Sequence, residues 1–303
     1  MNVVETSGVG KRYGGTWALR DCTLAIPAGH VAALVGPNGA GKTTLLNLVV
    51  GLASPSEGLV SVLGGRPAGS SAALDGIAFV AQDTPLYRNL TAADMLHMTR
   101  NLNRRFDDRF ARTRLDELAI PLDRRGGDLS GGQQAQLALT LALARHPQLL
   151  VLDEPMAMLD PLARHDFMAT VMTAVADDGV SVLLSSHVLA ELERVADYLV
   201  LASHGRIQVS GEVDHLLAEH CVLTGPTTEA SAYAGRLNVV HARRGEAQAQ
   251  LLVRKNRESD AVPAGWEIHR VSLEELTLAY LREPAAAAFT GPRADTEAIR
   301  ALR

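Results

Sequence analysis

The segment Gly36–Thr43 constrains this chain most strongly, because Gly-Pro-Asn-Gly-Ala-Gly-Lys-Thr has the Gly-x-x-x-x-Gly-Lys-Thr spacing of a phosphate-binding loop. The apolar run Val31–Val35 before it predicts a buried strand, and the apolar segment Thr43–Val50 predicts a helix after it. Glycines let successive backbone N–H groups point at a polyphosphate, while the helix N-terminus adds positive potential. The loop therefore predicts a nucleotide site in which Lys42 reaches the β- and γ-phosphates and Thr43 binds Mg²⁺.

From Cys22 to about Glu219 the chain alternates short β-rich runs with longer helical segments, which predicts a mainly parallel sheet covered by helices. The further predicted strands are Gly58–Leu63, Ile77–Val80, Leu149–Leu152, Ser181–Leu184 and Tyr198–Leu201. Residues 91–145 contain no convincing strand pattern. The helices expected in their place are Thr91–Leu102, Asp107–Leu118 and Gly132–Ala144. We therefore predict an α/β domain that carries a helical subdomain over about residues 88–147.

The run Leu149–Glu154 is an apolar strand that ends in two carboxylates. The carboxyl end of a buried parallel strand lies at the sheet edge where the phosphate-binding loop also opens. We expect Asp153 to hold Mg²⁺. Strand side chains alternate, so Glu154 faces differently and is placed to polarise an attacking water. Together with the loop, these carboxylates predict a nucleotide hydrolase.

The segment Leu129–Gln133 reads Leu-Ser-Gly-Gly-Gln, and Ser130 with the two glycines predicts a second anion-binding helix start. A chain with its own phosphate-binding loop does not need another cradle for the same phosphate. On these motifs, residues 1–220 resemble the ATPase subunit of an ABC (ATP-binding cassette) transporter, whose signature sequence matches Leu129–Gln133 residue for residue. The resemblance implies a P-loop cassette fold with an antiparallel β part. It also implies a head-to-tail dimer in which each signature closes on the ATP of its partner.

The resemblance also implies roles for residues outside these motifs. Gln82, which follows a predicted strand, matches the glutamine that reaches Mg²⁺ and the attacking water, and His187 matches the switch histidine that donates to the γ-phosphate. Tyr13 matches the aromatic residue that stacks on adenine, the alternative being ordinary half-buried packing. Asp160 matches the residue that couples the two ATP sites across the dimer.

The motifs and the resemblance together define the predicted site. The residues predicted to bind ATP are Tyr13, Gly36, Pro37, Asn38, Gly39, Ala40, Gly41, Lys42, Thr43, Thr44, Ser130, Gly131, Gly132, Gln133 and Asp160. Those predicted for catalysis are Lys42, Gln82, Glu154 and His187, and those for Mg²⁺ are Thr43, Gln82 and Asp153. Ala157 and Met158 depart from the family's pattern, in which a serine and a small residue are common, and are expected to weaken the coupling.

The sequence changes character after residue 220, which predicts a small α+β accessory domain over residues 221–283 and a flexible tail over 284–303. Strands are expected at Val239–His241 and Gln250–Val253, and Ser272, with a glutamate three residues on, predicts a capped helix start. Regulation, dimerisation and simple stabilisation all remain open as roles for this accessory domain.

Composition limits the partners that the chain can have. Its 303 residues carry 29 basic and 34 acidic side chains, a net charge of −5, which argues against binding to nucleic acid through phosphate neutralisation. The two cysteines, Cys22 and Cys221, lack metal-ligand spacing, and no apolar run approaches the roughly 20 residues of a membrane-spanning helix. No secretory signal is evident at the N-terminus.

The resemblance therefore implies a peripheral protein on the cytoplasmic face of the cell membrane, whose partners are a separate permease and a second cassette, with a homodimer expected. In the family, the region that matches Thr84–Met95 receives coupling helices of the permease, although plain core packing is the alternative. The segment Val271–Leu281 resembles the ending of ATPases from antibiotic and multidrug exporters, which favours export. The competing hypothesis is a soluble ABC-type ATPase that acts on ribosomes or DNA, but the single P-loop and the lack of a heptad run argue against it.

Overall fold

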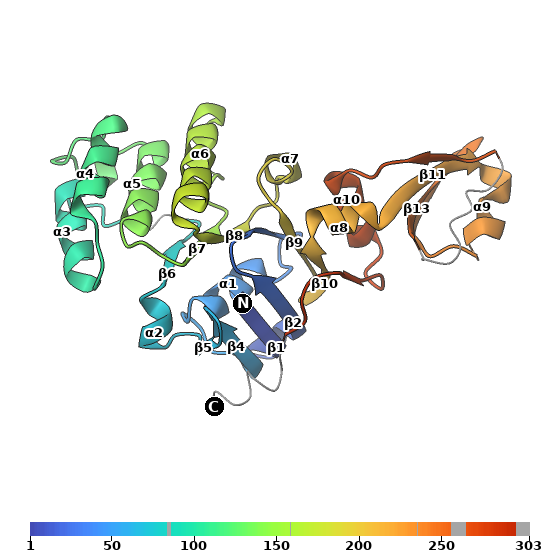
Figure 1. The fold of residues 1–303 in the computed structure, drawn as a ribbon, viewed down its shortest axis with the longest axis horizontal. Coiled ribbons are helices and arrows are strands. Elements are labelled where there is room, and N and C mark those ends of the chain that lie inside the picture. The colour runs from blue at the N-terminus through green and yellow to red at the C-terminus, as the bar shows by residue number, and fades with distance from the viewer. Residues whose placement is uncertain (84–85, 158, 235, 256–264, 295–303) are drawn as a thin grey trace.

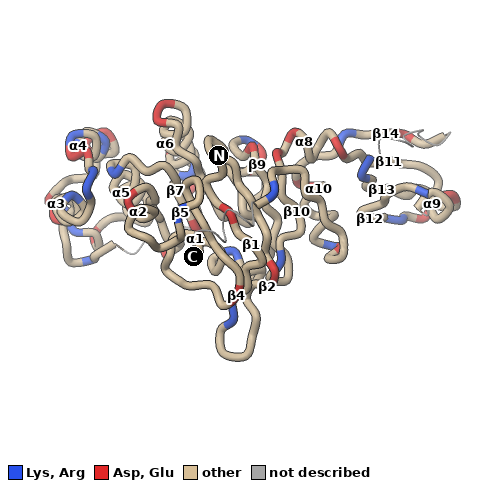
Figure 2. Tube along the Cα trace, turned by 60° about the horizontal axis from the view of Figure 1, so that its bottom comes forward, with Lys and Arg blue, Asp and Glu red and all other residues tan. Residues whose placement is uncertain are grey.

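The computed structural model describes residues 1–83, 86–157, 159–234, 236–255 and 265–294. The described strands form three sheets (Figure 1). Charged side chains of both signs are interspersed along the trace (Figure 2). In the part of the chain that is described, no helix is both long and apolar enough to span a bilayer.

The central sheet has the strand order β15-β10-β9-β3-β8-β7-β6 among the described residues. Its strands are β3 (Val31–Val35), β6 (Ile77–Val80), β7 (Leu149–Asp153), β8 (Ser181–Ser185), β9 (Tyr198–Ser203), β10 (Arg206–Glu212) and β15 (Ala288–Phe289). The strands from β9 to β6 in this order pair in parallel, whereas β10 runs antiparallel to β9. Every residue of β3, β7, β8 and β9 is buried, which explains their continuous apolar runs and confirms the predicted parallel core.

A second, antiparallel sheet has the order β2-β1-β4-β5 and corresponds to the predicted antiparallel part. Its strands are β1 (Asn2–Tyr13), β2 (Thr16–Pro27), β4 (Glu57–Val62) and β5 (Arg66–Pro67). The sequence pattern did not locate β1 and β2, because register shifts along their pairing interrupt the regular alternation of buried and exposed residues. Helix α1 (Lys42–Val49) packs its buried leucines into the same core as residues of both sheets.

The helical insertion has the predicted composition. Helices α3 (Ala92–Leu102), α4 (Asp108–Glu117) and α5 (Gly131–Leu143) share a hydrophobic cluster of their own, in which Met95 and Leu115 are fully buried. Side-chain caps start all three helices, and a capping box starts both α3 and α5. Outside the insertion, the other described α-helices before the third sheet are α2 (Ser71–Leu74), α6 (Pro161–Asp178), α7 (Leu189–Leu192) and α8 (Val213–Ala218).

The C-terminal part forms a third sheet, of order β12-β13-β11-β14, which projects away from the rest of the molecule (Figure 1). Its strands are β11 (His220–Pro226), β12 (Val239–Arg244), β13 (Gln248–Arg254) and β14 (Glu267–His269), and helix α9 (Thr227–Ala234) packs on one face. The predicted pairing of the 239–241 and 250–253 strands is confirmed, and both strands extend further than expected.

The C-terminal segments differ in two respects from the predicted division. Helix α10 (Leu273–Arg282), capped by Ser272 as predicted, packs into the hydrophobic cluster of the main domain, which also includes Val240 and Leu252 of the third sheet, so it joins the two parts. Strand β15 pairs with the free edge of β10, with Ala288 fully buried, so this part of the expected flexible tail is held by backbone hydrogen bonds. Residues 295–303 of that tail lie outside the described residues.

A buried pair, His220 and Tyr280, joins the start of β11 to α10. The Nδ1 atom of His220 lies 2.6 Å from the Leu216 carbonyl oxygen, which can only accept, so Nδ1 carries the proton. Its Nε2 atom then accepts from the Tyr280 hydroxyl at 2.7 Å. Burial lowers the pKa of His220 and raises the pKa of Tyr280 to about 12, so the folded protein retains this neutral arrangement.

We expect this pair to make folding stability fall under mild acid. As pH drops below about 6.5, His220 becomes protonated in the unfolded chain but stays neutral in the folded chain, whose lowered pKa disfavours the charged form. The unfolding free energy therefore declines by up to about 1.4 kcal/mol per pH unit. Urea unfolding of wild type and His220→Phe between pH 7.5 and 5 measures this slope, which the variant should lose. His269→Gln, at an exposed position, is the control. Equal slopes for wild type and His220→Phe would contradict the assignment.

Candidate nucleotide-binding site

The loop between β3 and α1 encloses one side of a cavity of about 830 Å³ at the carboxyl edge of the central sheet. Gly41 caps α1 with a φ of 98°, a left-handed conformation that favours glycine. At Gly36 a Cβ atom would lie 2.3 Å from the Ala202 carbonyl oxygen of β9, so a side chain is excluded there. The residues that line the cavity are Ala18, Gly36, Pro37, Asn38, Gly39, Gly41, Lys42, Thr43, Thr44, Gln82, Glu154, Ala157 and His187.

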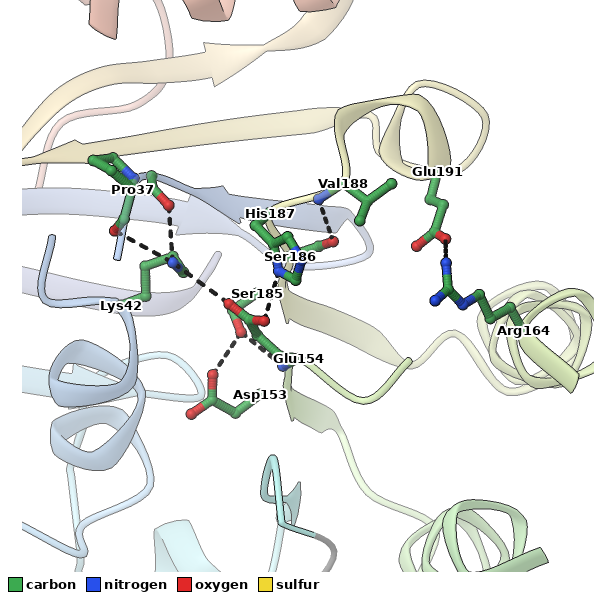
Figure 3. A network of polar contacts seen from close by, with 11 residues as sticks. Pro37, Lys42, Asp153, Glu154, Arg164, Ser185, Ser186, His187, Val188 and Glu191 are labelled. Atoms are coloured by element: carbon green, nitrogen blue, oxygen red, sulfur yellow. Dashed lines mark hydrogen bonds and ion pairs between the residues drawn. The ribbon is translucent and has the colours of Figure 1, made fainter. Parts of the chain in front are cut away.

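Lys42 is the first residue of α1, and its side chain is 6% exposed. The Nζ atom donates to the carbonyl oxygen of Gly36 at 2.8 Å and lies 3.5 Å from Oε1 of Glu154 (Figure 3). Its charge adds to the positive potential of the helix N-terminus, where backbone N–H groups lack helical partners. This corner of the cavity is therefore suited to a polyphosphate.

Two carboxylates at the end of β7 point in different directions. Asp153 ends the strand and accepts a 2.6 Å hydrogen bond from the Ser185 hydroxyl on β8. Glu154 has a φ of 45°, so a left-handed turn aims its side chain into the cavity, and its N–H donates to the same Ser185 oxygen at 2.9 Å. The side chains of Asp153 and Glu154 point in different directions, as predicted. The cause is the left-handed backbone conformation of Glu154 rather than the alternation of side chains along a strand. Ser185 was not predicted as a site residue, although the two serines directly before His187 were a usable signal.

His187 completes a row of three side chains across the cavity. Its Nδ1 atom lies 2.7 Å from Oε2 of Glu154, and an ionised carboxylate only accepts, so Nδ1 carries the proton in this contact. The ring is 57% exposed, which leaves its other nitrogen accessible to a ligand. Lys42 at the start of α1, Glu154 after β7 and His187 after β8 thus meet around one carboxylate (Figure 3). Gln82, the fourth predicted catalytic residue, lines the same cavity.

Other predicted residues lie away from the described lining of the cavity. Tyr13 is 52% exposed at the end of β1, with the Lys11 ammonium 5.1 Å from its ring centroid. Ser130 and Gln133 form the capping box of α5, where Ser130 and Gly131 are exposed. Asp160 caps α6 by accepting from the Ala163 N–H at 2.9 Å. Met158 lies outside the described residues.

The predicted magnesium ligands suit a hard divalent cation, which prefers oxygen donors. Asp153 is only 2% exposed, and within the described part of the chain its carboxylate has a hydroxyl donor but no ion-pair partner. A buried carboxylate without a cation is costly, so a bound cation would stabilise it. Thr43 and Gln82 offer a hydroxyl and an amide oxygen in the cavity wall, whereas Asp153 is not among the described residues that line the cavity.

The fold and the site together define a P-loop nucleotide-binding protein of the ATP-binding cassette class. Residues 19–157 match the family model described as ABC transporter. The chain belongs to the ABC transporter family, as the ATP-binding subunit.

Similar proteins with described functions include ATP-binding proteins of both export and import systems. The chain is 37% identical over 226 residues to the Nod factor export ATP-binding protein I of Sinorhizobium fredii, covering 71% of this chain and 64% of that protein. It is 36% identical to the Fe(3+) ions import ATP-binding protein FbpC of Pseudomonas fluorescens, covering 70% and 62%. A Nod factor export ATP-binding protein I of Rhizobium johnstonii is 35% identical, covering 71% of each chain. The match therefore spans less than two thirds of the first two relatives.

Solved structures give the same class. The structure of an ATP-binding subunit of an ABC transporter superposes with a TM-score of 0.64 at 28% identity, covering 71% of this chain and 92% of the other. A dimeric ATP-binding cassette in a post-hydrolysis state, bound to ADP and Pi, superposes with a TM-score of 0.61 at 25% identity, covering 69% and 98%. These matches confirm the predicted cassette fold.

Proposed function

We propose that this chain hydrolyses ATP and thereby drives transport through a separate membrane protein. The observation that carries the proposal is the row Lys42–Glu154–His187 at a phosphate-binding loop. Cation, carboxylate and imidazole side chains converge there on a cavity large enough for a nucleotide. In phosphoryl transfer, rate enhancement comes mainly from positioning and from stabilisation of charge on the phosphate oxygens.

Each side chain in the row has a distinct proposed role. The loop N–H groups and Lys42 hold the β- and γ-phosphates, while Glu154 accepts the proton of the attacking water. His187 donates to Glu154 through Nδ1, and it would also donate to the γ-phosphate when its other ring nitrogen carries a proton. Gln82 orients the water. Thr43, Asp153 and Gln82 would hold Mg²⁺, which when bound neutralises charge on the phosphate oxygens.

We further propose a head-to-tail dimer of cassettes. The N-terminus of α5, with exposed Ser130 and Gly131, lies apart from the cavity of its own chain, so it is free to meet the ATP of a partner. Tyr13 would stack on adenine, and Asp160 would couple the two sites. The dimeric state of the similar ADP-bound cassette supports this arrangement.

The proposed membrane partner is a permease that docks on the helical insertion from the cytoplasmic face. Tyr87, five residues after Gln82, is 60% exposed, so this segment is not entirely plain core. Residues 84–85 of the same segment lie outside the described part of the chain. We propose export as the direction, with an antibiotic, a drug or a lipid-like molecule as substrate. The similar Nod factor exporters support this direction, and the similar Fe(3+) importer defines the alternative to be tested.

A pull-down tests the partner directly. Tagged Glu154→Gln protein, incubated with ATP and Mg²⁺, is expected to retain a polytopic membrane protein from detergent-solubilised cells of its source. Tagged Lys42→Ala serves as the control that should lose any ATP-dependent retention. Recovery of ribosomes or DNA-bound proteins without a membrane protein would overturn the transport proposal. Substrate accumulation in inside-out vesicles that contain both subunits would then establish export.

A further inference from the structure

A second ion pair lies beside the hydrolytic row and has no role in the proposed chemistry. Arg164, in the first turn of α6, places Nη1 2.8 Å from Oε1 of Glu191 on α7 (Figure 3). The Nε atom of the same guanidinium donates to the Leu159 carbonyl oxygen at 2.8 Å. One side chain therefore ties the backbone just before α6 to helix α7.

Both tied segments lead directly to the hydrolytic residues. Helix α7 begins two residues after His187, and the Val188 N–H donates to the Ser186 hydroxyl at 3.0 Å in the turn between them. The backbone before α6 follows from Glu154. A small cavity of about 50 Å³ lies between the Arg164–Glu191 pair and the Glu154–His187 pair. Its lining residues are Glu154, Pro155, Met156, Ala157, Arg164, Ser185, Ser186, His187, Val188 and Glu191.

Helix α7 depends on tertiary contacts for its position. It has only four residues, and a single helical turn does not hold itself together in water. Leu192 anchors it in the main core, and the Glu193 carboxylate accepts from the Glu274 N–H of α10 at 3.2 Å. The Arg164–Glu191 pair lines the small cavity that Glu154 and His187 also line.

From this geometry we propose that Arg164 is a positioning residue for ATP hydrolysis. It holds α7 against the segment after Glu154, and this keeps His187 Nδ1 within hydrogen-bond distance of the Glu154 carboxylate. The planar guanidinium is needed because two acceptors in different elements are reached by different nitrogens of one rigid group. A lysine has one ammonium nitrogen and lacks the two separated donors that Arg164 uses for the Leu159 carbonyl and the Glu191 carboxylate. This inference rests on the proposed ATPase function.

The test separates turnover from nucleotide binding. Arg164→Ala is expected to lower kcat about 10- to 100-fold with less than about a twofold change in the KM for ATP. Arg164→Lys should fall nearly as far, and Glu191→Gln should reproduce the direction. Arg194→Ala is the matched control, because Arg194 is an exposed arginine three residues beyond Glu191 and should keep wild-type kcat.

A spectroscopic readout distinguishes positioning from loss of stability. In NMR spectra of ¹⁵N-histidine-labelled protein, the Nδ1–H signal of His187 should shift downfield through its carboxylate contact. That shift should disappear in Arg164→Ala at a temperature where the variant is folded. If Arg164→Ala does not fold, Arg164→Lys and Glu191→Gln carry both measurements.

Either of two results overturns the inference: kcat within twofold of wild type in the Arg164 variants, or an unchanged His187 signal. A wild-type chain that binds ATP without hydrolysing it would instead overturn the proposed function. The His187 signal still decides the positioning role in that case, so the two failures are distinguishable.

Discussion

The Glu154→Gln variant is expected to bind ATP with wild-type affinity and to lose about 10²- to 10⁴-fold of its steady-state turnover. The carboxylate lies 2.7 Å from His187 and 3.5 Å from Lys42, at the point where the three side chains meet. An amide keeps the size of the side chain but cannot take the proton of the attacking water. Phosphate release measures turnover, and equilibrium binding of ATP measures affinity.

The control for this prediction is Glu117→Gln, at an exposed position on α4, which should hydrolyse ATP like wild type. Because ATP persists in the Glu154 variant, the head-to-tail dimer should accumulate and elute earlier in size-exclusion chromatography with ATP. Wild-type turnover in Glu154→Gln would remove this residue from its proposed role as the base.

Lys42→Ala is expected to weaken ATP binding about 10- to 100-fold, because charge-assisted hydrogen bonds to phosphate contribute roughly 1.5–3 kcal/mol. The Lys42 side chain is almost fully buried at the helix start, so little solvent screens its interaction with a phosphate. Fluorescence titration with a nucleotide analogue and isothermal calorimetry with ATP both measure the loss.

Two control measurements accompany the Lys42→Ala prediction. Lys255→Ala removes an exposed ammonium that donates to the Ala218 carbonyl oxygen, far along the chain from the loop, and should leave affinity unchanged. Thermal unfolding of Lys42→Ala checks that the Glu154 carboxylate, deprived of a nearby cation, has not destabilised the fold. An unchanged affinity in a folded Lys42→Ala protein would rule out the nucleotide-binding assignment of the loop.

Much of the cassette could be predicted because its signals are local. Strands β3, β7 and β8 are buried on both faces, so they are continuous apolar runs in the sequence. The starts of α5 and α10 show as Ser-x-x-Gln and Ser-x-x-Glu capping boxes, since both partners of a cap lie within four residues. Irregular pairing hid β1 and β2, whose register shifts interrupt the alternation that identifies a strand.

The C-terminal part shows where local signals fail. Helix α10 looks like part of the accessory domain in sequence, yet Leu276 and Tyr280 lie in a cluster that joins the main core to one side of the third sheet. Strand β15 is two residues long and is held by backbone pairing with β10, so its own side chains form no strand pattern. Which core receives a segment depends on what the rest of the chain leaves exposed.

The sequence by itself determined the phosphate-binding loop, the parallel core and the residue types of the site, because each shows as short contiguous runs of sequence. Only the tertiary structure decided how Lys42, Glu154 and His187 meet. Their contacts depend on the order of β3, β7 and β8 in the sheet and on the left-handed turn at Glu154. The need for glycine at Gly36 also has a nonlocal cause, the Ala202 carbonyl oxygen from β9. Distances between residues far apart in the chain are set by packing, which no single segment contains.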